Sequence, residues 1–367
     1  MPMGKKLRVA LVFGGRSGEH EISLMSARSI FGALDRDRYE AVLIGIDRQG
    51  RWRLQDEGRA LLEAKDALTL DTSTSHITLA PGEGRAMTGG GGIGPVDVVF
   101  PVLHGPYGED GTVQGLLEMA GVPYVGAGVL GSSVGMDKDV AKRLLRDAGV
   151  RVVEYLTVHA GNRPSPEKVA AQVEDTFGFP CFVKPANLGS SVGVHRVRDA
   201  AALEAGLADA FRYDRKVLVE RAVSAREIEC SVLGNEQPRA SLPGEIVPHD
   251  EFYSYRAKYI DENGAALLIP ADLSPERVTE VQETSIRAFL ALELAGMARV
   301  DFLLEHGSGR LYLNEVNTIP GFTKISMYPK LWDATGLPYA KLVDRLIELA
   351  LERHALREKL STEYSAT

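Results

Sequence analysis

Two runs in which apolar and polar residues alternate, 297–305 and 311–317, constrain the fold of this chain most strongly. Successive side chains of a β-strand point to opposite faces of the sheet. Arg299 and Asp301 therefore lie on one face of the first run. The apolar residues that alternate with them lie on the opposite face. The glycines between the runs predict a tight turn. We expect a hairpin that gathers polar side chains on one face.

The oxygen-bearing side chains of this hairpin suit a hard divalent cation. Glu315 and Asn317 share one face of the second run, so that both can converge with Asp301. Two carboxylates and an amide oxygen, with no His or Cys nearby, favour Mg²⁺ over Zn²⁺. Mg²⁺ held by few protein ligands usually shares its shell with substrate phosphates. The alternative is an exposed hairpin whose polar residues face water.

The composition indicates a globular protein of two or three domains. The chain has 367 residues, of which 44% are hydrophobic and 25% charged, a usual balance for such proteins. Its formal charge of −8 argues against general nucleic-acid affinity, so any phosphate site must be local. No apolar run approaches the ~20 residues that span a bilayer, and Lys5-Lys6 precedes a strand and a glycine turn rather than a signal sequence. We expect no membrane partner and a cytoplasmic location.

The N-terminal third has the pattern of an α/β domain with a parallel sheet. An apolar run ends at Gly14-Gly15 and is followed by apolar residues at helical spacing, which predicts a strand, a turn and a helix. Further short apolar runs alternate with helical patterns, as in parallel sheets. The expected strands are Leu7–Phe13, Ala41–Ile46, Val96–Leu103 and Val122–Val125, with a helix at Thr112–Ala120.

The rest of the chain indicates α+β units and one long polar stretch. Strands are expected at Cys181–Pro185, Ser191–Val197, Lys216–Glu220 and Glu227–Leu233, and helices at Asp137–Ala148, Asp199–Phe211, Ser274–Leu294 and Tyr339–Leu356. The stretch Pro243–Asn263 is rich in Tyr and has no convincing period, so it is either an ordered functional loop or disordered. Its segment around Lys258 is a candidate lid over phosphates.

A glycine- and serine-rich loop between two expected strands has the features of a phosphate site. The loop runs from Lys184 through Gly189-Ser190-Ser191 to Gly193. It offers backbone N–H and hydroxyl donors and one lysine charge to phosphate oxygens. It does not match the Walker A pattern. An ordinary structural Gly-Ser hairpin is the alternative.

Other polar residues also sit where strands are expected to end. Glu19 follows the first glycine turn, where open α/β sheets bind ligands, and suits a substrate ammonium. A dinucleotide site built on that turn would lack the Gly-x-Gly-x-x-Gly fingerprint, but Asp47 could serve as the acidic residue that binds the ribose. Glu220 and Glu227 suit a nucleotide base and ribose, or are merely exposed acids.

Seven motifs in order along the chain resemble those of the D-alanine:D-alanine ligase family in the ATP-grasp superfamily. The resemblance runs from about residue 7 to residue 333. The motifs are Gly14-Gly15 with Ser17, Glu19-His20-Glu21 and Ser23; His104-Gly105 with Gly108-Glu109-Asp110-Gly111; Met136-Asp137-Lys138; Val183-Lys184-Pro185 with Gly189-Ser190-Ser191-Val192-Gly193; Ala257-Lys258-Tyr259; Arg299 with Asp301; and Asn314-Glu315-Val316-Asn317-Thr318 with Pro320-Gly321.

This resemblance implies a three-part ATP-grasp architecture of α/β and α+β units. An N-terminal parallel-sheet domain at 1–126 would bind the first D-alanine. A central small subdomain at 127–220 and a C-terminal subdomain at 221–367, with a lid at about 243–263, would hold ATP between them. The resemblance also implies a homodimer.

The implied reaction has two stages. ATP phosphorylates the carboxylate of one D-alanine, and the amine of a second attacks the acyl phosphate to give D-alanyl-D-alanine, a peptidoglycan precursor. Two Mg²⁺ ions, with Mn²⁺ as a substitute, would be held by Asp301, Glu315 and Asn317. ATP would be bound by Lys138, Lys184, Ser191, Glu220, Glu227 and Lys258.

The resemblance further implies which residues handle the amino acids. Glu19 would hold the first ammonium group, with Ser190 and Tyr259 completing a network that orders the lid. Arg299 and the Gly321 N–H would form the oxyanion site. The second carboxylate would be received by Ser326, with His104 as a further substrate contact.

Three alternatives stay open at this point. Another acceptor, D-lactate or D-serine, would give a related product, although Tyr259 in the lid favours an amine acceptor. A different ATP-grasp ligase would share the ATP contacts but not Glu19, Tyr259 and Ser326. A non-catalytic nucleotide-binding protein would release no phosphate with D-alanine and ATP.

Overall fold

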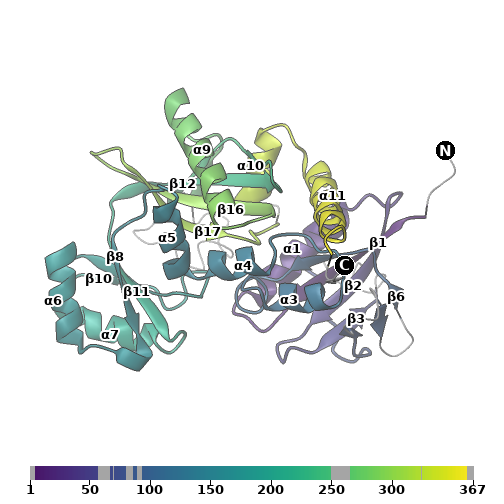
Figure 1. Cartoon of the computed structure of the whole chain (residues 1–367), viewed down its shortest axis with the longest axis horizontal. Coiled ribbons are helices and arrows are strands. Elements are labelled where there is room, and N and C mark those ends of the chain that lie inside the picture. Colours follow the sequence, from purple (N-terminus) through teal and green to yellow (C-terminus); the bar gives the residue numbers. More distant parts are fainter. Residues whose placement is uncertain are drawn as a thin grey trace, which may run out of the picture.

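The computed structural model describes residues 5–56, 67, 68, 70–79, 86–88, 93–248, 265–323 and 325–361. The expected lid residues Lys258 and Tyr259 lie outside these ranges. Three main sheets follow one another along the chain, and Figure 1 shows the first at the right, the second at the lower left and the third between and above them. No helix among the described residues is long and apolar enough to cross a membrane.

The N-terminal sheet confirms the predicted parallel strands. Its order is β3-β2-β1-β7, and β1 pairs in parallel with both β2 and β7, whereas β3 is antiparallel to β2. Apolar runs without alternation are expected here, because both faces of a parallel sheet are covered. The elements are β1 (Leu7–Gly14), α1 (His20–Ala33), β2 (Tyr39–Ile46), β3 (Trp52–Gln55), β7 (Val98–Val102) and α3 (Thr112–Met119), with a small sheet of β4 (Thr78–Leu79), β5 (Ala86–Thr88) and β6 (Gly94–Pro95) beside them.

The expected strand at Val122–Val125 was wrong, because the segment makes only one isolated bridge. Tyr124 pairs with Val99, whose N–H donates to the Pro123 carbonyl and whose carbonyl accepts from Val125. Proline has no N–H to extend a ladder, and Gly126, with φ of 97°, turns the chain away.

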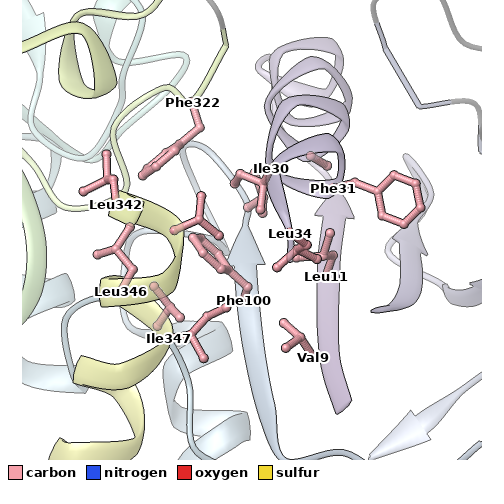
Figure 2. Packing of buried hydrophobic residues seen from close by; sticks show 14 of the residues in the cluster. Val9, Leu11, Ile30, Phe31, Leu34, Phe100, Phe322, Leu342, Leu346 and Ile347 are labelled. Carbon is pink, nitrogen blue, oxygen red and sulfur yellow. The ribbon is translucent and has the colours of Figure 1, made fainter. Parts of the chain in front are cut away.

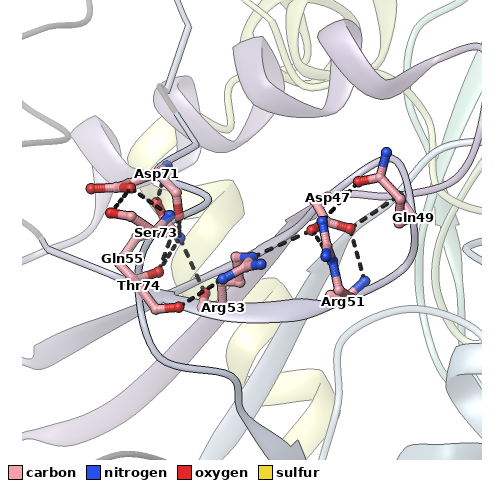
Figure 3. Close-up of polar contacts among 8 residues, drawn as sticks. All are labelled: Asp47, Gln49, Arg51, Arg53, Gln55, Asp71, Ser73 and Thr74. Atoms are coloured by element: carbon pink, nitrogen blue, oxygen red, sulfur yellow. Dashed lines mark hydrogen bonds and ion pairs between the residues drawn. The ribbon is translucent and has the colours of Figure 1, made fainter.

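The turn after β2 is organised by Asp47 (Figure 3). Its carboxylate accepts from the backbone N–H groups of Gln49 and Arg51, both at 3.0 Å, and from the guanidinium groups of Arg51 at 2.7 Å and Arg53 at 3.3 Å. Burial acts to raise the pKa of Asp47, but these donors outweigh it and lower the pKa to about 2. The carboxylate suggested for a dinucleotide ribose is therefore committed to holding its own loop.

The central sheet is antiparallel and small. Its order is β10-β9-β11-β8, and two helices pack against it through Val169, Val173, Leu203 and Leu207. Asp199 caps the second helix by accepting from the Ala202 N–H, as short acceptors at this position commonly do. The elements are β8 (Tyr155–His159), the 3₁₀ helix η1 (Ala160–Asn162), α6 (Pro166–Thr176), β9 (Cys181–Pro185), β10 (His195–Val197), α7 (Ala200–Ala210) and β11 (Lys216–Arg221).

The C-terminal sheet carries the predicted hairpin at one edge. Its order is β15-β14-β12-β16-β17, and β13 also pairs with β12. Helix α9 packs on it, and α5 contributes Ala141 and Leu145 to the same core as Phe289 and Val300. The elements are α4 (Val129–Met136), α5 (Lys138–Asp147), β12 (Ala225–Gly234), β13 (Arg239–Ala240), β14 (Gly244–Pro248), β15 (Ala265–Leu268), α9 (Pro275–Ala291), β16 (Gly296–Glu305) and β17 (Leu311–Asn317).

The two last helices join the C-terminal part to the N-terminal sheet. They are α10 (Met327–Ala334) and α11 (Tyr339–Arg357). Figure 2 shows Leu342, Leu346 and Ile347 of α11 facing Phe100 of β7, in one buried cluster. Phe322 belongs to this cluster, with its ring 6.0 Å from that of Phe100. The loop before α10 is thus anchored on the N-terminal domain.

Candidate active site

The predicted hairpin is confirmed as β16 and β17. Asp301 lies opposite Glu315, and Arg299 lies opposite Asn317. The Asn317 side-chain amide donates to Asp301 at 2.9 Å. A register shift after Asp301 leaves Asn314 on the same side, where its oxygen accepts from Lys184 at 3.4 Å. Strand alternation alone gave no sign of Asn314, because bulges break the period of two.

Arg299 is held by two carboxylates. It donates to both oxygens of Asp301, at 2.8 and 2.7 Å, and its Nε lies 2.9 Å from an oxygen of Glu229. Glu229 lies opposite Asp301 on the neighbouring strand β12. Sequence reasoning missed it, although it follows Glu227 by two residues and so shares its face. Paired bonds of this kind fix the plane of a guanidinium group.

The donor set of the hairpin fits a hard cation. In the described part of the chain, no three His, Cys, Asp or Glu side chains cluster as a metal site. The hairpin offers two carboxylates and one side-chain amide. Asp301 and Asn317 are already in contact, and Lys138 lies 3.6 Å from Glu315. Arg299 and Lys138 are thus the cationic neighbours of the two carboxylates in this structure, and a divalent cation bound by Asp301 and Glu315 would take over part of this charge pairing.

A buried triad of charges lies beside the hairpin. Glu220 of β11 lies 2.6 Å from Lys184 of β9 and 2.7 Å from Lys142 of α5. Burial acts to raise the pKa of Glu220, but the two ammonium groups outweigh it and lower the pKa. Burial lowers the pKa of Lys142, and Glu220 opposes this. Lys142 was missed, although it follows Lys138 by one helical turn and so shares its face.

A cleft of about 920 Å³ opens between the central and C-terminal sheets. Its volume is in the range of sites that take nucleotide-sized ligands. It brings together most of the residues expected at ATP, namely Lys138, Lys184, Ser191, Glu220 and Glu227, with Ser190 and Glu315. Lys138 also donates to the Leu188 carbonyl at 2.7 Å, which ties α5 to the glycine- and serine-rich loop.

Glu19 meets this loop from the N-terminal domain. The Ser190 hydroxyl donates to the Glu19 carboxylate, and Glu19 itself is buried. Gly105 packs so closely that an added Cβ would lie 2.5 Å from a Glu19 oxygen, and its φ of 75° also favours glycine. Ser190 and Ser191 have φ of 53° and 58°, a strained backbone that often marks functional loops.

His104 uses both ring nitrogens within the protein. Its Nδ1 lies 3.0 Å from the Ile319 carbonyl, which can only accept, so Nδ1 carries the proton. Its Nε2 then accepts from the Ser26 hydroxyl at 3.1 Å. Burial lowers the pKa of His104, which keeps the ring neutral. In this structure the ring therefore contacts a loop rather than open space.

That loop contains the two remaining candidates. Gly321 lies between buried Pro320 and Phe322, and an added Cβ would come within 2.8 Å of the Ser326 hydroxyl. The Thr323 N–H donates to the same hydroxyl at 3.0 Å. Within the described residues, no acceptor is bonded to the Gly321 N–H. The loop thus brings a backbone donor and a hydroxyl together.

Comparisons with known proteins agree along nearly the whole chain. The family models D-ala D-ala ligase N-terminus and D-ala D-ala ligase C-terminus match residues 8–127 and 144–348. The D-alanine–D-alanine ligase A of Chromobacterium violaceum is 53% identical over 362 residues, covering 97% of this chain and 98% of that protein.

Two solved structures extend this likeness to the fold. The D-alanine-D-alanine ligase from Coxiella burnetii has a TM-score of 0.87 at 41% identity and covers 97% of each chain. The VanG D-Ala:D-Ser ligase from Enterococcus faecalis has a TM-score of 0.83 at 34% identity, covering 94% of this chain and all of that one (100%).

Proposed function

Because the chain belongs to the D-alanine:D-alanine ligase family, we propose that it joins two D-alanine molecules in an ATP-dependent reaction. The products are D-alanyl-D-alanine, ADP and phosphate, and the dipeptide serves peptidoglycan precursor synthesis. The observation that carries this proposal is the contact between Glu19 and Ser190. Through this contact Glu19, an acid that suits an amino-acid ammonium group, lies next to the glycine- and serine-rich loop that lines the nucleotide-sized cleft.

ATP occupies the cleft between the two sheets in this proposal. Lys138 and Lys184 contact the α- and β-phosphates, and Ser191 donates from the loop beside them. Glu220 and Glu227 take the adenine and the ribose. The positions of these residues around one cleft support the assignment. Lys258, which lies outside the described residues, would cover the γ-phosphate.

Asp301, Glu315 and Asn317 would hold two Mg²⁺ ions, for which Mn²⁺ could substitute. Bound there, the ions would offset the negative charge that builds up as the γ-phosphoryl group is transferred. The proposal is supported by the facing positions of Asp301 and Glu315 in the hairpin. Lys138 moves from Glu315 toward the phosphates when they enter.

The amino acids bind on the side of Glu19. The Glu19 carboxylate holds the first ammonium group, and Ser190, together with Tyr259 of the lid, completes the network around it. Attack by the second amine places negative charge on the reacting carbonyl oxygen. Arg299 and the Gly321 N–H stabilise this oxyanion, a contact worth about 3–4 kcal/mol.

Ser326 receives the carboxylate of the second D-alanine. Its hydroxyl accepts from the Thr323 N–H at 3.0 Å and shares a hydrogen bond of 2.7 Å with the Thr323 hydroxyl. When the Thr323 hydroxyl is the donor, the Ser326 proton is available to the substrate. D-Alanine is the proposed acceptor. D-Serine is the second candidate, because a D-Ala:D-Ser ligase is among the structural relatives at 34% identity, and D-lactate is the third.

Turnover by the purified protein tests this function. The protein is incubated with Mg-ATP and D-alanine, with L-alanine, or with D-alanine plus D-serine or D-lactate, at several pH values. Formation of ADP and D-alanyl-D-alanine that depends on D-alanine is expected. Folded protein that forms no ADP with D-alanine would refute the assignment. If the main product joins D-alanine to D-serine or D-lactate, that molecule is the acceptor instead of a second D-alanine.

We also propose a homodimer and a cytoplasmic location, both on the strength of family membership. Sedimentation equilibrium at several protein concentrations tests the first. Fractionation of the producing cells tests the second.

A further inference from the structure

We infer that Glu109 is a positioning residue that holds the loop 318–323 through the backbone of Ile319. The inference rests on the proposed function, because it concerns the Gly321 N–H as an oxyanion donor. Glu109 has no substrate contact in the proposed function, and its proposed effect on the reaction passes through the loop. Its charge also repels that of Glu19.

The Glu109 carboxylate bridges two parts of the chain. One oxygen accepts from the Ile319 N–H at 3.0 Å, and the other accepts from the Gly105 N–H at 2.7 Å. Gly105 follows β7 of the N-terminal domain, whereas Ile319 follows β17 of the C-terminal sheet. Glu109 is buried, so water does not compete for these bonds.

The same segment also holds the Ile319 carbonyl. His104 donates to it at 3.0 Å, so residues 104–109 bind both polar backbone groups of Ile319. Three residues further on, the Phe322 N–H donates to the Ser26 hydroxyl at 3.2 Å. Ser26 in turn donates to His104, which closes the network.

Gly321 therefore lies between two fixed points of the loop, Ile319 and Phe322. A glycine has the widest range of backbone conformations, and a donor for an oxyanion must be aimed before the charge forms. A shift of about 1 Å in such a group can cost a factor of 10² in rate. The network removes this freedom without placing a side chain in the site.

A carboxylate suits this bridge better than an amide does. Burial and repulsion from Glu19 raise the pKa of Glu109, the Gly105 and Ile319 N–H groups favour the ionised form, and the balance puts the pKa at about 8. A glutamine has one acceptor oxygen, and its NH₂ group would face an N–H donor. Glu109→Gln should therefore lose one of the two bonds while keeping the volume.

The test compares Glu109→Gln with wild type at pH 9, where Glu109 is ionised. We expect kcat to fall about 10- to 100-fold, with KM for ATP within about twofold of wild type. Hydrogen–deuterium exchange of the peptide 316–323 should become faster. Asp97→Asn is the matched control, because Asp97 accepts from the Arg8 N–H at 2.7 Å in the same domain, away from the site. It should leave kcat and the exchange of this peptide unchanged.

Ser26→Ala provides a second variant, which removes the bond to Phe322 without changing the Glu109 carboxylate. It should also raise exchange in 316–323 and lower kcat. An unchanged kcat in a folded Glu109→Gln protein, or a lower kcat with unchanged exchange in both variants, would overturn the inference. Lack of D-alanine turnover by wild type would instead refute the proposed function, and the exchange measurement would still decide whether Glu109 holds the loop.

Discussion

Lys142 and Glu220 form a buried ion pair, with 2.7 Å between the ammonium and carboxylate groups, that joins helix α5 to strand β11. Lys184 binds the other oxygen of the same carboxylate at 2.6 Å. One negative charge thus lies between two positive charges, and Glu220 and Lys184 line the nucleotide-sized cleft. If the Glu220 carboxylate were removed, the ammonium groups of Lys142 and Lys184 would both be left as buried charges without this partner.

Replacing Lys142 by methionine should destabilise the protein and weaken nucleotide binding. The buried Glu220 carboxylate would keep Lys184 as its partner, so no charge is left unpaired, and the variant loses one hydrogen bond between charged groups, which contributes about 1.5–3 kcal/mol. The free energy of unfolding in urea should fall by this order, and KM for ATP should rise about tenfold, the equivalent of about 1.4 kcal/mol, because Glu220 would be held from one side only. Lys168→Met, at an exposed position of α6, should change neither quantity. Equal effects of both variants would contradict the role of the triad.

Glu315→Gln should remove turnover with little loss of fold. The substitution keeps the shape of the side chain but removes one of the two carboxylates available to a divalent cation. We expect kcat to fall at least about 10²-fold, while the circular dichroism spectrum and the urea midpoint stay close to wild type. Arg310→Gln, in the exposed turn of the same hairpin, should retain full activity. A normal rate in Glu315→Gln would refute its role at the metal.

Glu19→Gln should affect D-alanine rather than ATP. The variant loses the charge proposed to bind the first ammonium group, and a hydrogen bond to a charged group contributes about 1.5–3 kcal/mol. KM for the first D-alanine should therefore rise about 10- to 100-fold, with KM for ATP unchanged. The measurement is the rate of ADP formation over a range of D-alanine concentrations. Glu21→Gln is the control, because the exposed Glu21 carboxylate pairs only with exposed Arg48 among the contacts described, and this variant should behave as wild type. An equal rise in KM for D-alanine in both variants would contradict the assignment.

Asp47 should make stability depend on pH in the acid range. Its pKa is lowered to about 2 in the folded protein, from an ordinary value of 3.8. Because the folded pKa lies below the unfolded one, the contribution is fully present well above pH 3.8 and is lost as the pH falls toward 2. Asp47→Asn should lower the free energy of unfolding by about 2 kcal/mol at pH 7.

The difference between wild type and Asp47→Asn should shrink as the pH falls from 5 toward 2, as measured by urea unfolding at each pH. Asp37→Asn serves as the control, since Asp37 is exposed, and it should show no such trend. A difference for Asp47→Asn that stays constant over this range would contradict the role given to its charge.

Local patterns predicted most of the elements because their causes are local. The alternation in 297–305 and 311–317 predicted the hairpin, and the helix expected over Asp199–Phe211 is α7, whose first turn Asp199 caps. The expected strand at Val122–Val125 failed where a single proline and a glycine interrupted an apolar run. Helix α4 was not predicted, since its Gly and Ser residues are poor helix formers and its packing comes from elsewhere in the chain.

The sequence by itself therefore determined the types of strand, turn and helix and the residues that suit phosphate, a divalent cation and an amino acid. Tertiary structure alone decided which partners the buried polar groups found. Glu109 binds Ile319 across 210 positions of the chain, and Ser190 binds Glu19 across 171 positions. The contacts of Lys142 with Glu220 and of Glu229 with Arg299 likewise exist only because α5 and β12 pack beside the other strands. The reason is physical: periodicity fixes the face on which a side chain lies, but a buried donor or acceptor is satisfied by whatever the packing of distant segments brings to it.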